Sequence, residues 1–286
     1  MKAAIIPNLT RDNALQITKN VCSELQHLNV ECLLSVSLQD TFYETINAVF
    51  LNDDQLIDES DLLISIGGDG SMIHAAKQAA VKGKRILGIN AGQLAYLCGV
   101  DADELQMLDR LVTGDYEVEE RMLLRVDRYD DGKFISSGFC VNDLVVSRGQ
   151  DMNLVDIEVN CSGQRIADYI ADGVIVATPT GSTAYNLAAG GPIAEPTLEA
   201  MLLTPICPHQ LNLRPYIFHA DSVLELKQGT RRGSGKLFAS FDGEKPFPLE
   251  PDSVLKITKA AIKVDFIKIK RVNFVDVLNV KMAFNR

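Results

Sequence analysis

The feature of this sequence that most constrains its fold is a pair of short apolar runs. Residues Leu62–Ile66 and Ile86–Ile89 carry apolar side chains on both alternating sets of positions. Strands of this kind are buried on both faces and belong to parallel sheets that helices cover. Between the runs, segment 71–82 is rich in alanine and precedes Gly83, which is typical of a helix followed by a C-terminal glycine. The pattern predicts an α/β sheet.

The same rhythm of short apolar runs and longer mixed stretches extends from residue 1 to about 115. The remaining runs are AAIIPN, ECLLSV and RILGIN, and the remaining mixed stretches, which we expect to be helical, are 11–28, 41–57 and 102–113. Alternation of this kind indicates βαβα order. We therefore predict a Rossmann-like α/β domain over residues 1–117.

Beyond residue 117 the sequence changes to β-branched and aromatic runs separated by turn signals. Asp131-Gly132 and Ser162-Gly163 lie between such runs and predict hairpins. We expect helices only at 182–190 and 196–203. The sequence thus predicts a β-rich, sandwich-like domain over residues 118–269. The pattern of 270–286 leaves its structure open, and a return to the N-terminal domain is one option.

The charge of the chain limits its partners. Asp and Glu number 38 against 28 Lys and Arg, which gives a formal net charge of −10. No large basic surface is then available for a nucleic-acid backbone, so we expect no nucleic-acid partner. An acidic protein can still bind phosphates through backbone N–H groups, a few placed cations and Mg²⁺.

The cysteines and the hydropathy pattern indicate the environment. Six cysteines are scattered without the paired spacing of a zinc site or a CxxC motif, and we expect them to be reduced thiols. No segment approaches the ~20 apolar residues of a membrane span, and the N-terminus lacks the apolar core of a signal peptide. We therefore expect a cytoplasmic protein without a membrane partner, and no metal-ligand cluster is visible.

The tetrapeptide Gly67-Gly68-Asp69-Gly70 lies where an apolar strand ends and a helical stretch begins. Ligands bind at this edge of a parallel sheet, and glycines let phosphate oxygens approach the backbone N–H groups at the start of the helix. A carboxylate there can take a proton from an attacking hydroxyl or hold Mg²⁺ against phosphates. The alternative is a tight turn in which Asp69 only caps the helix.

A second motif runs from Asp172 to Pro192, with the sequence DGVIVATPTGSTAYNLAAGGP. It indicates a strand, a loop of Thr, Ser and Gly, a short helix and a glycine turn. Hydroxyls and N–H groups in such a loop can bind a sugar or a phosphate. The alternative for TGST alone is a helix cap that binds no ligand.

Together these motifs resemble the NAD kinase family. GGDG, the Asn-Asp pair in VNDLVVSRG, the block ADGVIVATPTGSTAYNLAAGGPI and LTPICPHQLNLRP occur in the family's order, and NAGQLAYLCGV matches an intermediate segment in outline. The resemblance implies a kinase that transfers a phosphoryl group from ATP, or from polyphosphate, to the adenosine ribose 2′-hydroxyl of NAD, and so makes NADP. It implies Mg²⁺ or another divalent cation that arrives with the donor.

The resemblance also assigns roles to residues. Asp69 falls on the general base, and Gly67, Gly68 and Gly70 on the cradle for the donor's phosphates. Asn142 and Asp143 fall on contacts to ribose hydroxyls of NAD, and Asp172 on a contact at its nicotinamide end. Further implied contacts are His74 near the NAD phosphates, Tyr96 against adenine, and the NAD-lining residues Thr183, Ala184, Tyr185, Asn186, Leu187 and Ala188, followed by Cys207 and Glu244, whose residue types are uncommon in the family. For His74 an exposed helix histidine without a ligand is the alternative.

The sequence departs from the family's pattern at several positions. Ala95 and Tyr96 replace Gly-Phe, so the ring is kept but a β-carbon is added. Ile170 replaces an arginine, which removes a cation near the ligand, and Pro7-Asn8 reverses the usual Asn-Pro. These changes put affinity and donor preference in doubt more than the reaction class.

The family is usually oligomeric, with active sites completed across subunits, so we expect a homodimer or a homotetramer. Two other functions share part of the pattern. A lipid or sphingoid kinase also carries GGDG, but it does not account for TPTGSTAY followed by GGP. A catalytically silent NAD sensor would keep the NAD pocket without phosphoryl transfer.

Overall fold

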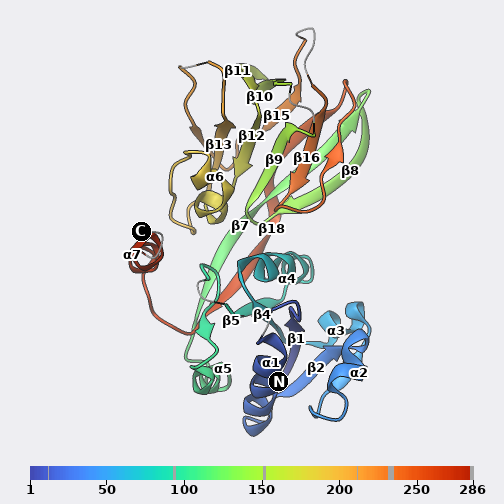
Figure 1. Ribbon diagram of the computed structural model, residues 1–286, viewed down its shortest axis with the longest axis vertical. Coiled ribbons are helices and arrows are strands. Elements are labelled where there is room, and N and C mark those ends of the chain that lie inside the picture. The colour runs from blue at the N-terminus through green and yellow to red at the C-terminus, as the bar shows by residue number, and fades with distance from the viewer. Residues whose placement is uncertain (12, 93–94, 151–152, 211, 231–234, 284–286) are drawn as a thin grey trace. The chain divides into compact units, whose positions relative to one another are not determined.

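The computed structural model describes the chain except for residues 12, 93–94, 151–152, 211, 231–234 and 284–286. Its contacts divide the chain into two units, which we describe separately (Figure 1). Unit 1 comprises Met1–Glu120 and Ile262–Arg286, and unit 2 comprises Arg121–Ala261. Unit 1 is therefore built from two separate stretches of sequence.

The centre of unit 1 is a parallel sheet with the strand order β5-β4-β1-β2-β3. Its strands are β1 (Lys2–Pro7), β2 (Glu31–Ser35), β3 (Val49–Leu51), β4 (Leu62–Gly67) and β5 (Arg85–Asn90). All six residues of β4 are buried, as its apolar sequence predicts. The chain moves from β1 toward β2 and β3, and then returns to β4 and moves the other way to β5. The point at which this direction changes lies between β1 and β4, where ligands bind in such sheets.

Helices and 3₁₀ turns connect these strands or follow them in the chain (Figure 1). They are α1 (Ala14–His27), α2 (Gln39–Phe42), α3 (Asp53–Glu59), α4 (Asp69–Val81), α5 (Asp109–Thr113) and α7 (Phe274–Ala283), with 3₁₀ turns η1 (Val36–Leu38) and η2 (Leu105–Leu108). Helix α1 buries Ile17, Val21 and Leu25, which lie four residues apart on one face. Residues of α3 and α4 line the same groove over β1, so these two helices cover one face of the sheet.

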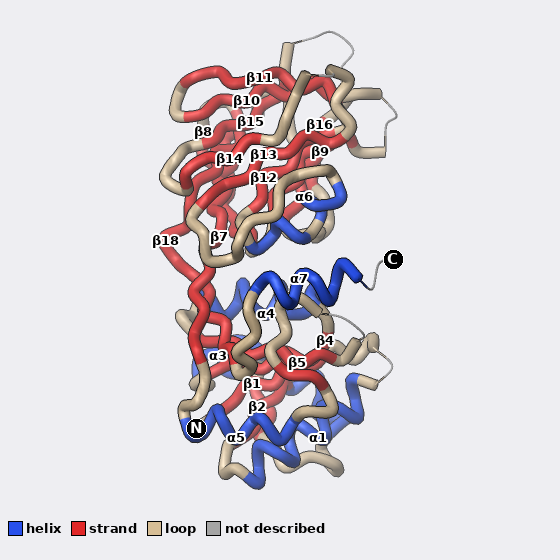
Figure 2. The backbone as a smooth tube through the Cα atoms, turned by 90° about the vertical axis from the view of Figure 1, so that its left-hand side faces the viewer, coloured by secondary structure: helices blue, strands red, loops and turns tan. Residues whose placement is uncertain are grey.

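Unit 2 is a sandwich of two antiparallel layers (Figure 2). One layer has the order β14-β13-β12-β9-β16-β17, and the other contains β11-β10-β15-β18 with the β7–β8 hairpin. The strands are β7 (Glu117–Asp130), β8 (Lys133–Cys140), β9 (Asp143–Arg148), β10 (Val155–Cys161), β11 (Gln164–Ala171), β12 (Gly173–Ala177), β13 (Ala200–Ile206), β14 (Tyr216–His219), β15 (Leu224–Gln228), β16 (Leu237–Phe241), β17 (Phe247–Pro248) and β18 (Val254–Lys268). Val146, Ile157, Val176 and Leu226 belong to the apolar core that these strands enclose.

Both predicted hairpins are present. Asp131 and Gly132 have φ values of 47° and 70° in the turn between β7 and β8, and Ser162 and Gly163 have 49° and 82° between β10 and β11. Two positive φ values in a row are the geometry of a type I′ turn, which matches the twist of the paired strands. The predicted fold class, an α/β unit followed by a β-rich unit, is confirmed.

Several predicted elements differ from those observed. Segment 41–57, expected to be a helix, contains β3, with α3 beginning at Asp53. Segment 196–203, also expected to be a helix, includes the start of β13, which is paired on both sides within its sheet. By contacts, unit 2 ends at Ala261 and the chain from Ile262 onward belongs to unit 1, where Asp265 and Phe266 of β18 pair with β5. The domain end at 269 that the sequence suggested stays a prediction. Segment 270–286, left open by the sequence, contains α7 and belongs to unit 1.

A short strand and two short helical segments complete the described elements. Strand β6 (Val100–Asp101) pairs with β5, and the TGST loop forms η3 (Thr180–Thr183), followed by α6 (Tyr185–Ala188). Among the described residues, no helix is long and apolar enough to cross a membrane.

Candidate active site

Asp69 is the first residue of α4, and its carboxylate is held by the loop that follows β5. Oδ1 accepts hydrogen bonds from the backbone N–H groups of Tyr96 and Leu97, at 2.7 and 2.9 Å, and Oδ2 lies 2.9 Å from the Tyr96 nitrogen. The preceding Gly68 is the N-cap and provides no side chain for capping. Asp69 therefore does not cap its own helix, and the alternative drawn from the sequence is wrong. These contacts fix the position of the carboxylate at the start of α4.

Tyr96 lies directly beside this carboxylate. Burial raises the pKa of the Tyr96 phenol above its ordinary value, and the negative charge of Asp69 adds to the increase. The ring is half-buried and stays neutral at physiological pH. A neutral ring at this position suits stacking on a base, whereas a phenolate would repel phosphates.

The glycine turn is joined to the end of β1. Asn8 donates from Nδ2 to the Ser71 hydroxyl at 2.8 Å, which ties the residue after β1 to the first turn of α4. A β-carbon added at Gly68 would lie 3.6 Å from the guanidinium of Arg11. A cation therefore lies beside the N-terminus of α4, the arrangement that binds phosphate. Gly70 is open, since nothing lies within 4 Å of a β-carbon added there.

His74 lies in a different part of unit 1. Its side chain is exposed and lines a groove over β1, together with residues of α3 and of the β2–η1 connection. Asp69 and Tyr96 do not line this groove. The structure thus places His74 on the β1 side of α4, while Asp69 contacts the loop on the β5 side.

In unit 2, Asn142 and Asp143 form a corner at the start of β9 that one carboxylate organises. Asp242 accepts from the backbone N–H groups of Val141, Asn142 and Asp143, at 2.9, 2.7 and 3.0 Å. Asp242 itself has a φ of 50° and begins a turn with Gly243, and its N–H donates to the carbonyl of Asp143. The predicted contact Glu244 is exposed in the same turn.

The TPTGST loop packs directly on this corner. The Thr178 hydroxyl donates to the Val141 carbonyl at 2.6 Å, and the Thr178 N–H donates to the Asn142 carbonyl at 2.8 Å. A β-carbon on Gly181 would lie 2.2 Å from the Asn142 oxygen, so only glycine permits this approach. Gly181 thereby allows the loop to pack against the Asn142-Asp143 corner.

The residues after this loop divide into structural and accessible positions. Asn186 is fully buried, and its amide donates to the carbonyls of Ser182 and Pro192 and accepts from the Thr204 hydroxyl at 2.7 Å. Its side chain therefore holds the loop to β13. Tyr185 is 45% exposed and available to a ligand. Ala188 is also exposed, and the partly exposed positions are Thr183, Ala184 and Leu187.

A second group of predicted residues lies at the opposite end of β12. Asp172 precedes this strand and accepts from Arg148 Nε at 2.7 Å. Arg148 thus supplies a cation beside Asp172, although Ile170 replaces the arginine that the family pattern has nearby. Cys207 is exposed, has a φ of 45°, and directly follows Ile206, whose carbonyl accepts from the Asp172 N–H.

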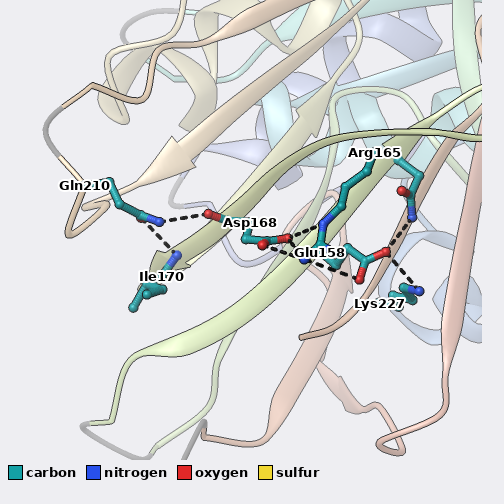
Figure 3. Close-up of polar contacts among 7 residues, drawn as sticks. Glu158, Arg165, Asp168, Ile170, Gln210 and Lys227 are labelled. Carbon is teal, nitrogen blue, oxygen red and sulfur yellow. Dashed lines mark hydrogen bonds and ion pairs between the residues drawn. The ribbon is translucent and has the colours of Figure 1, made fainter. Parts of the chain in front are cut away.

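Ile170 lies at the edge of a charged network on β10, β11 and β15 (Figure 3). Its N–H donates to Gln210 Oε1 at 3.2 Å, and Gln210 Nε2 donates to the Asp168 carbonyl. Further along the network, Arg165 pairs with Asp168 and Lys227 with Glu158. Hydrogen bonds from Asn160 and Lys227 hold the pKa of Glu158 below its ordinary value against the opposing effect of burial. This network fixes the strands that lead to Asp172.

Among the described residues, no group of three or more His, Cys, Asp or Glu side chains is arranged to hold a metal ion. Four residues that the sequence analysis did not assign to a site lie beside or hold the predicted positions. Asn8 and Arg11 do so in unit 1, and Arg148 and Asp242 do so in unit 2. For Asp242 the turn dipeptide Asp242-Gly243 was an available signal, because Asp in such a turn commonly binds backbone N–H groups.

The fold and these contacts define a class. A glycine turn with an anchored carboxylate and a nearby arginine, at the ligand-binding edge of a doubly wound sheet, is the arrangement of a nucleotide-dependent phosphotransferase.

Comparisons with known proteins narrow this class. The ATP-NAD kinase N-terminal domain model matches residues 4–116, and the C-terminal domain model matches residues 141–269. The NAD kinase of Symbiobacterium thermophilum is 41% identical over 79% of both chains, and that of Caldanaerobacter subterraneus is 35% identical over 99% of both. The chain belongs to the NAD kinase family, whose members phosphorylate NAD to NADP.

Solved structures agree with this assignment. An NAD kinase from Archaeoglobus fulgidus in complex with ATP is 25% identical, with a TM-score of 0.72 and 95% of both chains covered. Yeast NADH kinase complexed with NADH has a TM-score of 0.88 over all of this chain and 88% of that one. At 22% identity, this second likeness concerns the fold.

Proposed function

We propose that this kinase phosphorylates the adenosine ribose 2′-hydroxyl of NAD, with ATP or polyphosphate as donor and Asp69 as general base. The observation that carries this assignment is the anchored carboxylate, which Tyr96 and Leu97 hold at the N-terminus of α4. A ribose hydroxyl is a weak nucleophile, and a positioned base contributes ~10²–10⁴-fold to such a reaction. Asp69 is the carboxylate of the Gly67–Gly70 turn and the first residue of α4.

The reaction follows from these positions. Asp69 takes the proton of the 2′-hydroxyl as its oxygen attacks the terminal phosphorus of the donor. The bond between that phosphorus and its bridging oxygen breaks, and ADP leaves when ATP is the donor. Arg11 and the N–H groups at the start of α4 stabilise the negative charge on the transferred group. Asp69 then releases its proton to solvent.

A divalent cation fits this arrangement as a companion of the donor. Mg²⁺ is held by substrate phosphates and at most one or two carboxylates, and it needs no cage of protein ligands. When bound, the cation neutralises phosphate charge.

For NAD we propose the contacts that the resemblance implies. Asn142 and Asp143 would bind ribose hydroxyls, with Tyr185 beside a ring and Asp172 at the nicotinamide end. The corner geometry supports the first pair, because Asp242 fixes the backbone of both residues. The exposure of Tyr185 supports the second role.

We further propose a homodimer or a homotetramer in which one subunit completes the site of another. Asp143 pairs with Ala177 at one end of β12, and Asp172 precedes Gly173 at the other. Five residues of extended strand separate the two ends by roughly 16 Å. This separation supports a role for Asp172 toward a ligand that a neighbouring subunit holds.

The test is production of NADP by the purified protein from NAD and Mg²⁺, with ATP or polyphosphate as donor. An NADP-specific dehydrogenase reports the product, and NAD binding is measured in parallel by calorimetry. We expect product with at least one donor, and the two rates rank the donors. Binding of NAD without product from either donor would contradict the proposal and favour a silent sensor.

A further inference from the structure

Unit 1 has a groove on one face of its sheet. Of the residues that the sequence analysis assigned to the site, only His74 lines this groove. Its apolar floor comes from β1 and α3 and includes Ile6, Pro7 and Leu56. Its polar rim is formed by Ser35, Ser37, Asp53, His74 and Gln78. We call it the α3–α4 groove, and its volume is about 240 Å³. Apolar walls with a few placed polar groups are typical of small-ligand sites.

The polar rim is ordered by its own hydrogen bonds. The Ser35 hydroxyl donates to Asp53 Oδ1 at 2.6 Å and lies 2.8 Å from the Ser37 hydroxyl. Ser35 also caps η1 by accepting from the Ser37 N–H. Three side chains from the β2 end and from α3 thus meet in the lining of the groove, to which α4 contributes His74 and Gln78. A carboxylate with adjacent hydroxyls is a suitable partner for the hydroxyl groups of a ribose.

The position of the groove relates it to the donor's phosphates. It lies over β1, at the point where the strand order of the sheet changes direction. Pro7 lines the groove, and the next residue, Asn8, bonds Ser71 in the first turn of α4. Arg11 follows in the same loop and lies beside Gly68. A ligand that extends from the groove toward the glycine turn would therefore pass the loop that carries Arg11.

The groove and the Asp69 carboxylate lie on different sides of β4. In the sheet, β4 has β5 on one side and β1 on the other. Asp69 is held from the β5 side by Tyr96 and Leu97, whereas the groove belongs to the β1 side. In-line transfer requires donor and acceptor on opposite sides of the transferred phosphoryl group. If the acceptor hydroxyl lies beside Asp69, on the β5 side, the donor is expected on the β1 side, where the groove lies.

We propose that the α3–α4 groove binds the nucleoside of a ribonucleoside triphosphate donor. The inference rests on the proposed function and deepens it, because it assigns a site to the part of ATP that polyphosphate lacks. Asp53 and Ser35 receive the ribose hydroxyls, the base lies on the floor beside Leu38 and His74, and the phosphates extend to Arg11 and the glycine turn. His74 accordingly contacts the donor rather than NAD.

The test compares Asp53→Asn and His74→Ala with the unaltered chain. We expect the KM for ATP to rise about tenfold for Asp53→Asn, the loss that accompanies removal of a hydrogen bond to a charged group. The KM for NAD should stay within twofold, although NAD also carries an adenosine. The Ki of tripolyphosphate, as a competitor of ATP that has no nucleoside, should also stay within twofold.

Asp54→Asn is the matched control, because Asp54 also lies in the first turn of α3 but does not line the groove. An unchanged KM for ATP in Asp53→Asn and His74→Ala would overturn the proposal, and so would equal changes for ATP and tripolyphosphate. Calorimetric binding of MgADP to the same variants makes the test independent of turnover. If the unaltered chain forms no NADP, the proposed function fails, while the MgADP affinities still decide whether the groove binds a nucleoside.

Discussion

At the scale of single residues, Asp69 has a structural role and a proposed catalytic role. Its carboxylate anchors the backbone of Tyr96 and Leu97, and the proposed reaction also requires it to accept a proton. Substitution by alanine would remove both functions. Asparagine keeps an oxygen that can accept from the same N–H groups, so it separates the catalytic function from the structural one.

We expect Asp69→Asn to lower kcat by ~10² or more and to leave the affinity for NAD within a few-fold, because a general base acts mainly in the transition state. Steady-state kinetics and calorimetry measure the two quantities. Asp109→Asn is the control, since Asp109 is likewise the first residue of a helix. Near-normal turnover in Asp69→Asn would leave Asp69 as an anchor for the loop only.

Gly181 offers a prediction at the same scale. A β-carbon there would lie 2.2 to 2.7 Å from three backbone atoms of Asn142. We expect Gly181→Ala to lower the free energy of unfolding by about 2 kcal/mol through this overlap and to raise the KM for NAD. Denaturant titration measures the first effect, with Gly70→Ala as the control because its added β-carbon meets no atom within 4 Å. A free energy of unfolding equal to that of the wild type in Gly181→Ala would mean that the Asn142-Asp143 corner can move away from the added β-carbon at little cost.

At the residue scale, the sequence predicted where the two local motifs lie in the fold. GGDG and TPTGST were assigned to strand-to-helix junctions, and both are found there. The contacts of Asp242 and Asn8 were not predicted, although Pro7-Asn8 was noted as a departure from the family pattern, because their partners lie 99 to 101 and 63 residues away in the chain. Their roles depend on pairings of β16 with β9 and of β1 with β4, which no local pattern specifies. The roles carried over from the family remain predictions.

At the scale of elements, buried strands with a strong apolar pattern were predictable, and two short segments were not. Strand β3 has only three residues, lies at the edge of its sheet and is at most half-buried. A strand of this length is too short to show an alternating pattern of apolar and polar residues. Strand β13 carries six buried residues in a row, including Pro205. Such a run fits a buried helix as well as a buried strand, and only its two neighbours in the sheet decide between them.

The connection between β18 and α7 has a predictable pH dependence. Lys270 lies 2.6 Å from Asp101 and also contacts Glu104. Burial opposes the charged forms, but these ion pairs and the Asn90 amide outweigh it, so the pKa of Asp101 is lowered and that of Lys270 is raised. The stability from Asp101 is therefore present above about pH 4 and is lost as the pH falls through its lowered pKa. That from Lys270 is present below about pH 10 and is lost as the pH rises through its raised pKa.

We therefore expect Lys270→Met to lower the free energy of unfolding by about 1 kcal/mol at pH 7, and by less at pH 3 and pH 11. Denaturant titrations at the three pH values measure the difference from wild type. Lys263→Met is a comparison for a more exposed pair, with Glu120, and we expect a smaller effect. A difference that does not depend on pH would show that packing of the lysine stem causes it.

At the scale of the whole molecule, the two ends of β12 lead to a test of assembly. If Asp172 serves a site in another subunit, a chain with Asp69→Asn and a chain with Asp172→Ala each retain what the other lacks. Mixing the two after joint refolding should restore NADP formation above the sum of the separate rates. A mixture of Asp172→Ala and Asp172→Asn chains is the control and should show no gain. A monomer by light scattering, or no gain in the first mixture, would contradict shared sites.

The division of unit 1 into two stretches of sequence also bears on how the protein is made. Ile262–Arg286 contribute to unit 1 the strand residues that pair with β5 and the lysine that binds Asp101. A ribosome delivers these residues only after the whole of Arg121–Ala261 has been synthesised. During translation the first 120 residues therefore lack the partner of β5 at Arg85 and Ile86 while the β-rich unit is synthesised, and an unpaired stretch of strand edge is open to pairing with other chains.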